Sequence, residues 1–161
     1  MVDILFCFQH RKITRTLLGF MSDFGLVIEV GSGAKSRRKL FEKAEFLSVG
    51  FGSSDLLQDV RYLGLRGESV DFLLTENVLE HVFDVKEAIR EIHRVLRTGG
   101  HFFMVTPFFF PLHDIPYDYF RYTAHALRLL LKDYSKVSIH PVLLFPFMTR
   151  FVLYYVCLAE K

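Results

Sequence analysis

In the middle of the chain, apolar and polar residues alternate in a pattern that predicts a strand, a helix and a second strand. The first apolar run, Val70–Leu74, ends in the polar residues Thr75–Asn77. A glycine pair at 99–100 is expected to end the helix, because glycine accepts the left-handed backbone of many helix ends. The second apolar run is His101–Thr106. The helix is predicted from apolar residues spaced along one buried face: Ile89, Ile92, Val95 and Leu96.

This strand–helix–strand unit predicts where a ligand would bind. A unit of this length favours parallel strands joined by a right-handed crossover. In parallel sheets of this kind, ligands bind beyond the carboxyl ends of the strands. Residues Thr75–Asn77 and the segment from Pro107 onward are therefore expected to border a site.

Weaker patterns complete the order of elements. The two closing strands leave no room for a crossover helix between them, so they favour an antiparallel hairpin. The whole pattern predicts one α/β domain over residues 1–161, with a doubly wound, mostly parallel sheet and that hairpin at its C-terminal end. The expected elements are a lead-in helix within 1–24, strands at 26–30 and 45–50 with a basic helix at 37–43 between them, a short strand near 56–60, a loop at 107–121, a helix at 123–132 and closing strands at 137–145 and 151–159.

Composition narrows the class of protein. A net charge of +2 over 161 residues makes no case for a nucleic-acid partner. No apolar run reaches the roughly 18–20 residues that span a bilayer. Cys7 and Cys157 lie at opposite ends and suggest neither a disulfide framework nor a metal site, so we expect a cytoplasmic protein. No other group of residues has metal-ligand spacing, and no metal is expected.

A glycine turn follows the first predicted strand, in the sequence VIEVGSGAKS at 27–36. Gly31 and Gly33 would let the backbone turn sharply and let a ligand approach its N–H groups. Glu29 would lie at the mouth of the strand, where it could accept hydrogen bonds from an amine or from the amides of the turn. Such turns also occur without a ligand, so this motif alone does not identify a site.

Three further motifs follow this turn in order: NVLEHV at 77–82, HRVLRTGG at 93–100 and PLHDIPYDYFRYT at 111–123. With them, the chain from about Leu26 to Thr123 resembles the class I S-adenosylmethionine-dependent methyltransferases, most closely the type 11 branch. The resemblance implies a Rossmann-like fold, S-adenosylmethionine as the cofactor, and methyl transfer to a small-molecule acceptor. A nicotinamide-dependent oxidoreductase is disfavoured, because the turn lacks the G-x-G-x-x-G spacing.

The resemblance also implies roles for individual residues. It assigns the methionine part of the cofactor to the glycine turn, its adenine end to the loop at 59–60 and the pocket wall to the end of the next strand. The cofactor-binding residues are then Glu29, Gly31, Ser32, Gly33, Asp59, Val60, Glu76 and Asn77.

Two departures from the family pattern stand out. Lys35 replaces the usual third glycine of the turn, and Gly50 stands where an acidic residue usually accepts both ribose hydroxyls. The next acid is Asp55. Loss of such an acceptor costs on the order of a few kcal/mol, roughly a hundredfold in affinity. The alternative hypothesis is therefore a methyltransferase-like domain that no longer catalyses and serves as a binding or scaffolding module.

The loop at 107–123 is expected to act as a lid over the acceptor. In the functional interpretation His113 is a general base or an anchor for the acceptor. In the structural interpretation Asp118 and Arg121 pair to fix the loop, and its aromatic rings only pack. The predicted substrate-binding residues are His81, Phe108, His113, Tyr117, Tyr119 and Arg121.

The acceptor and the oligomeric state stay open. Acceptor specificity in such folds lies in loops whose sequence does not reveal it. The apolar C-terminal strands leave a homodimer as one option.

Overall fold

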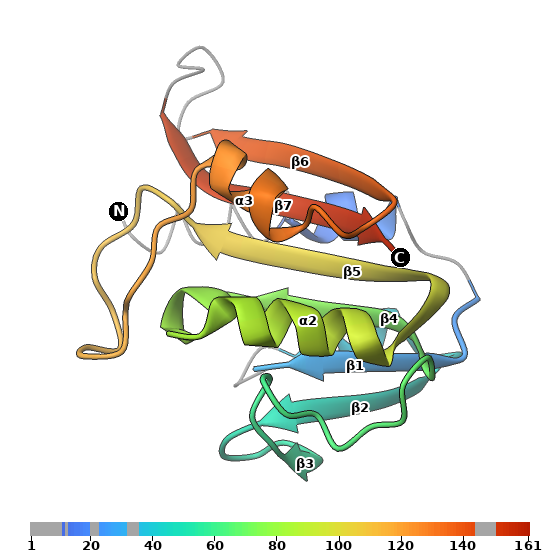
Figure 1. Cartoon of the computed structure of the whole chain (residues 1–161). Coiled ribbons are helices and arrows are strands. Elements are labelled where there is room, and N and C mark those ends of the chain that lie inside the picture. Colours follow the sequence, from blue (N-terminus) through green and yellow to red (C-terminus); the bar gives the residue numbers. More distant parts are fainter. Residues whose placement is uncertain (1–10, 12, 20–22, 32–35, 144–150) are drawn as a thin grey trace.

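The computed structural model describes residues 11, 13–19, 23–31, 36–143 and 151–161. Among them, seven strands form one sheet in the order β3-β2-β1-β4-β5-β7-β6 (Figure 1). The strands are β1 (Leu26–Val30), β2 (Glu45–Gly50), β3 (Leu56–Leu57), β4 (Val70–Glu76), β5 (Leu96–Pro107), β6 (Lys136–Leu143) and β7 (Val152–Glu160). The helices are the short 3₁₀ turns η1 (Arg38–Leu40) and η2 (Leu79–His81) and the α-helices α2 (Val85–Val95) and α3 (Ala124–Leu130), and residues 13–18 are helical as well.

The strand directions confirm the predicted fold class. Strands β1 to β5 run parallel to one another, whereas β7 is antiparallel to both β5 and β6. The C-terminal hairpin is therefore present, and it is added to the edge of a parallel sheet. Since β7 lies inside the sheet, β6 is the edge strand of the hairpin, and β3 is the edge strand on the other side of the sheet as described. No helix among the described residues is long and apolar enough to cross a membrane.

Each face of the sheet has its own apolar layer. Helices α2 and α3 cover the face nearer the viewer in Figure 1, and the helical residues 13–18 lie behind the sheet. The α2 face is built from the predicted apolar stripe, in which Ile89, Ile92 and Val95 are buried. The opposite layer contains a cluster of phenyl rings: Phe24, Phe41, Phe72 and Phe103.

The helix predicted over 37–43 is wrong, because residues 36–44 contain only η1. β1 and β2 are parallel neighbours, so the chain must return along the strand length, about 17–20 Å. An α-helix rises 1.5 Å per residue, and a helical return would take about 11–13 residues. Only 14 residues separate Val30 from Glu45, and the turns at both ends use part of them. The connection is too short for a helix.

The glycine pair does not end the helix as predicted. α2 ends at Val95, and Leu96 is already extended, so both glycines lie within β5. A Cβ added to Gly100 would lie 2.8 Å from the carbonyl oxygen of Arg97 and 3.1 Å from that of Val70. Glycine is needed here because neighbouring backbones approach closely where the register between β4 and β5 shifts.

Other predicted elements lie partly outside the described residues. Within the lead-in helix expected at 1–24, residues 13–18 are helical, and positions 1–10, 12 and 20–22 lie outside the description. Residues 144–150, which include the end of the closing strand predicted at 137–145, also lie outside the described residues.

Candidate functional site

A cavity of about 650 Å³ opens at the carboxyl ends of β1, β2 and β4. Gly31 follows β1, Gly50 ends β2 and Asn77 follows β4, and all three border it. The remaining walls come from residues 58–61, from η2 and the residues after it, and from the loop at 107–123. This is the edge where parallel sheets bind ligands, and the volume lies in the range of small-molecule sites.

Half of the predicted site residues line this cavity: Gly31, Asp59, Val60, Asn77, His81, Tyr117 and Tyr119. Five others have described positions but are not part of the lining: Glu29, Glu76, Phe108, His113 and Arg121. Ser32, Gly33 and the departure at Lys35 lie outside the described residues.

Gly31 occupies a position that only glycine can fill. Its φ of +72° is in the left-handed region. A Cβ added there would lie 2.4 Å from Cγ2 of Val78, the residue after Asn77. The N–H of Gly31 donates to the carbonyl of Val49 at 2.8 Å. The ends of β1, β2 and β4 are thus held in direct contact at the cavity.

Gly50 also has a backbone that excludes other residues. Its φ of +150° lies in a region that is essentially restricted to glycine. Asp55 does not supply the missing carboxylate to the cavity, because it accepts hydrogen bonds from the N–H and hydroxyl of Ser48 at 2.7 and 2.8 Å and pairs with Arg38. The bond from the Ser48 N–H is the main cause of the lowered pKa of Asp55. Asp55 stabilises the β2–β3 connection.

Glu29 and Glu76 both bind Arg37, a buried residue that the sequence analysis missed. Glu29 accepts from the Arg37 N–H at 2.8 Å and from the Ser36 hydroxyl at 2.5 Å. The Arg37 guanidinium donates to both carboxylate oxygens of Glu76, at 2.5 and 2.8 Å. Burial raises the pKa of Glu29 despite these bonds. The two carboxylates hold the chain after the glycine turn against the sheet.

Asp59 has a cationic partner at the cavity wall. Arg61 donates to its carboxylate, with the shortest contact at 2.7 Å, and also pairs with Asp84 at 3.3 Å. The hydrogen bonds from Arg61 lower the pKa of Asp59. Arg61 itself lines the cavity. The sequence could have suggested this ion pair, because Arg61 follows Asp59 by only two residues.

The loop at 107–123 is attached to η2 by its backbone. The N–H groups of Tyr119 and Phe120 donate to the carbonyl of Glu80 at 2.9 and 3.2 Å. The hydroxyl of Tyr122 donates to the carbonyl of Leu79 at 3.0 Å. These bonds bring two of the predicted aromatic residues, Tyr117 and Tyr119, to the cavity.

Two predicted acceptor-binding residues have other partners. Arg121 pairs with Asp118 at 2.5 and 2.7 Å, as in the structural interpretation of the loop. This guanidinium holds the pKa of Asp118 well below its usual range. The ring of Phe108 packs edge-on against Tyr155, with 5.7 Å between centroids.

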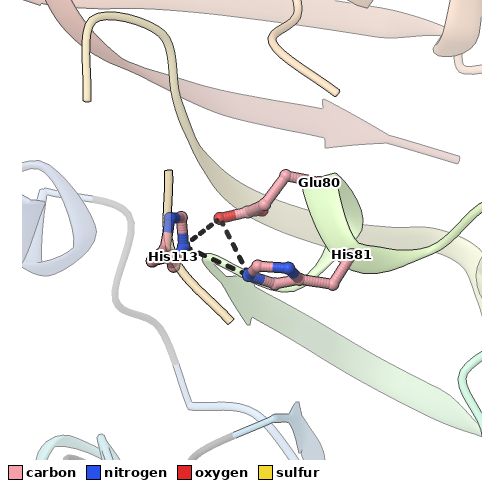
Figure 2. A group of neighbouring side chains, drawn as sticks. All are labelled: Glu80, His81 and His113. Atoms are coloured by element: carbon pink, nitrogen blue, oxygen red, sulfur yellow. Dashed lines mark hydrogen bonds and ion pairs between the residues drawn. The ribbon is translucent and has the colours of Figure 1, made fainter. Parts of the chain in front are cut away.

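His113 lies beside His81, and Glu80 completes the group (Figure 2). The Nε2 atoms of the two histidines are 3.1 Å apart. The side chain of Glu80 is fully buried, and within the described part of the chain its carboxylate oxygens accept no hydrogen bond. Burial raises the pKa of Glu80 to about 8. Local spacing could not reveal this group, because His113 comes from a loop 32 residues after His81.

Comparison with known proteins agrees with the sequence resemblance. Residues 28–104 match the model of the type 11 methyltransferase domain. An uncharacterised 37.1 kDa protein in transposon TN4556 of Streptomyces fradiae is 34% identical over 93 residues, which are 57% of this chain. The match spans only 26% of that protein.

Solved structures show the same fold. A possible histamine N-methyltransferase from Thermotoga maritima aligns with a TM-score of 0.72 at 14% identity, over 92% of this chain and 87% of its own. An S-adenosylmethionine-dependent methyltransferase from Archaeoglobus fulgidus aligns with a TM-score of 0.74 at 12% identity, over 91% and 90%. Phosphoethanolamine N-methyltransferase 2 of Haemonchus contortus, solved with S-adenosyl-L-methionine, has a TM-score of 0.72 at 12% identity, over 95% and 52%.

The pairing of Arg37 with Glu76 predicts a clear stability effect. We expect Arg37→Met to lower the free energy of unfolding by about 3 kcal/mol, because it leaves a half-buried carboxylate without its cation. The double variant Arg37→Met, Glu76→Gln should recover a large part of that loss. Urea unfolding of the three proteins measures both effects. A loss below about 1 kcal/mol in the single variant would contradict the assigned role.

Proposed function

We propose that the chain transfers a methyl group from S-adenosylmethionine to a small-molecule acceptor, on the premise that residues 28–104, which match the model of a methyltransferase domain, form such a domain. One observation carries the proposal. The cavity lies at the joined ends of β1, β2 and β4, with the side-chain-free Gly31 in its wall. The relatives of the same fold supply the reaction class.

The cavity residues fit the two ends of the cofactor better than its middle. Gly31 lines the side of the cavity assigned to the methionine part, and Asp59 and Val60 line the side assigned to the adenine. Asn77 would form the wall between them. The ribose would meet Gly50, which has no side chain to bind its hydroxyls. Binding of the cofactor is therefore expected to be weak for this class of enzyme.

The acceptor would enter under the loop at 107–123. Tyr117 and Tyr119 line the cavity and would exclude water from the reacting atoms. In the reaction, the acceptor oxygen or nitrogen forms a bond to the methyl carbon as the bond from carbon to sulfur breaks, and the sulfur leaves as a neutral thioether. The acceptor also loses a proton, for which His113 is the proposed base. Positioning supplies much of the rate.

A second candidate function follows from Gly50 and from Arg61. Gly50 has no carboxylate to accept the hydroxyls of the ribose, and Arg61 already donates hydrogen bonds to the carboxylate of Asp59. If these changes abolish useful cofactor binding, the domain is a methyltransferase-like binding module. Cofactor binding therefore separates the two functions.

The proposal predicts stabilisation by S-adenosylhomocysteine and S-adenosylmethionine but not by NADH. Ligand at about a hundred times its dissociation constant adds roughly 2.7 kcal/mol, which raises the melting temperature by several degrees. Gly31→Ala should abolish the rise. Gly99→Ala is the control for backbone strain alone, because Gly99 has nearly the same φ, +74° against +72°, and open space where Gly31 would meet Val78. If neither S-adenosylmethionine nor S-adenosylhomocysteine raises the melting temperature at millimolar concentration, the result would favour the binding module.

A pair of substitutions at Gly50 tests the missing acid. Both Gly50→Asp and Gly50→Ala should cost about 1–3 kcal/mol of stability, because the φ of +150° is strained for any side chain. Only the aspartate adds a carboxylate at the ribose. We expect Gly50→Asp to bind S-adenosylmethionine tighter than Gly50→Ala by up to about a hundredfold, as measured by calorimetry. Equal affinities would show that the ribose does not lie at this position.

A further inference from the structure

We propose that Glu80, His81 and His113 bind one divalent transition-metal ion, with Zn²⁺ as the ion that this donor set suits best. Two imidazoles and one carboxylate are a known ligand set for Zn²⁺ sites that keep a fourth position open. The three side chains come from η2 and from the loop at 107–123, and they converge in Figure 2.

The spacing of the donor atoms fits one ion. The Nε2 atoms of His81 and His113 are 3.1 Å apart, and Oε1 of Glu80 lies 3.9 Å from the first and 3.7 Å from the second. A point equidistant from the three corners of that triangle is about 2.1 Å from each, which equals the usual length of Zn–N and Zn–O bonds.

Hydrogen bonds on the far sides of both rings direct their lone pairs toward this point. Nδ1 of His81 lies 3.0 Å from the carbonyl oxygen of Tyr117, which can only accept. Nδ1 of His113 lies 3.2 Å from the carbonyl oxygen of Pro111 and 3.2 Å from Asp118. Each Nδ1 is therefore the nitrogen that donates to a carbonyl, and each Nε2 points toward the other ring. Metal-binding histidines are oriented in this way.

The centre of this group lies within reach of all three side chains. The two Nε2 atoms face each other at 3.1 Å, and the buried carboxyl group of Glu80, which has no hydrogen-bond partner among the described residues, lies at the third corner. Arg121 forms its ion pair with Asp118 and not with Glu80. A proton between the rings would satisfy the two nitrogens only, since Oε1 of Glu80 is beyond hydrogen-bond distance from both. A metal ion would satisfy all three donors.

The place of the ion suggests a use for it. His81 also lines the cavity, so the ion would lie at the edge of the proposed acceptor site. Its open position could take water or a hydroxyl oxygen of the acceptor and lower the pKa of that group. This part rests on the proposed function, and it favours an acceptor that carries a hydroxyl group. His113 would then act as a ligand, and the ion would replace it in promoting loss of the proton.

Metal titration tests the site without cofactor or acceptor. The chain, freed of metal with a chelator, should bind one Zn²⁺ in calorimetry, and Co²⁺ should develop the visible absorption of a site with nitrogen and oxygen ligands. Glu80→Gln and His113→Asn should each weaken binding at least tenfold. His125→Asn is the control, because His125 is exposed and lies outside the group.

The outcomes are distinct. Absence of a bound ion, or equal binding by the wild type and by the Glu80 and His113 variants, would overturn the metal site and favour a proton shared by the two rings. Equal weakening in the His125 variant would show binding at surface histidines and would overturn it as well. Because the titration contains no S-adenosylmethionine, its result is independent of whether the chain transfers methyl groups.

Discussion

The attachment of the loop at 107–123 to η2 is the interaction on which the site depends. The carbonyl of Glu80 accepts from the N–H groups of Tyr119 and Phe120. These bonds bring the loop's tyrosines to the cavity and hold His113 against His81. Without them the sheet would still present the ends of β1, β2 and β4. The open side of the cavity would then lose Tyr117 and Tyr119 of the loop, and His113 would no longer lie beside His81.

The cavity combines features of a cofactor site with groups that stabilise the fold. Gly31 borders the cavity, and a Cβ cannot fit there because the side chain of Val78 packs against it. Other residues expected at the cofactor are instead bound to arginines. Arg37 binds Glu76, and Arg61 binds Asp59. The site therefore keeps the shape of a nucleotide-binding edge with fewer free carboxylates than the sequence pattern suggested.

Much of the fold could be predicted from the sequence because its signals are local. The apolar run of β1 and the stripe of α2 predicted both elements, and β1 and β2 match the expected bounds. The errors had geometric causes, such as a connection before β2 too short for a helix. In the site, half of the expected residues line the cavity. The group around Glu80 was missed because His113 reaches it only through the path of a loop, which residue spacing cannot express.

The most direct test of the account is a ¹H–¹⁵N spectrum of the labelled protein during titration with S-adenosylhomocysteine. The account predicts that the amide signals of Gly31, Val60 and Asn77 shift together with one dissociation constant, since all three border the same cavity. Signals of β6, at the other edge of the sheet, should stay in place. A spectrum without shifts at millimolar ligand, or with shifts confined to β6, would contradict a cofactor site at the ends of β1, β2 and β4.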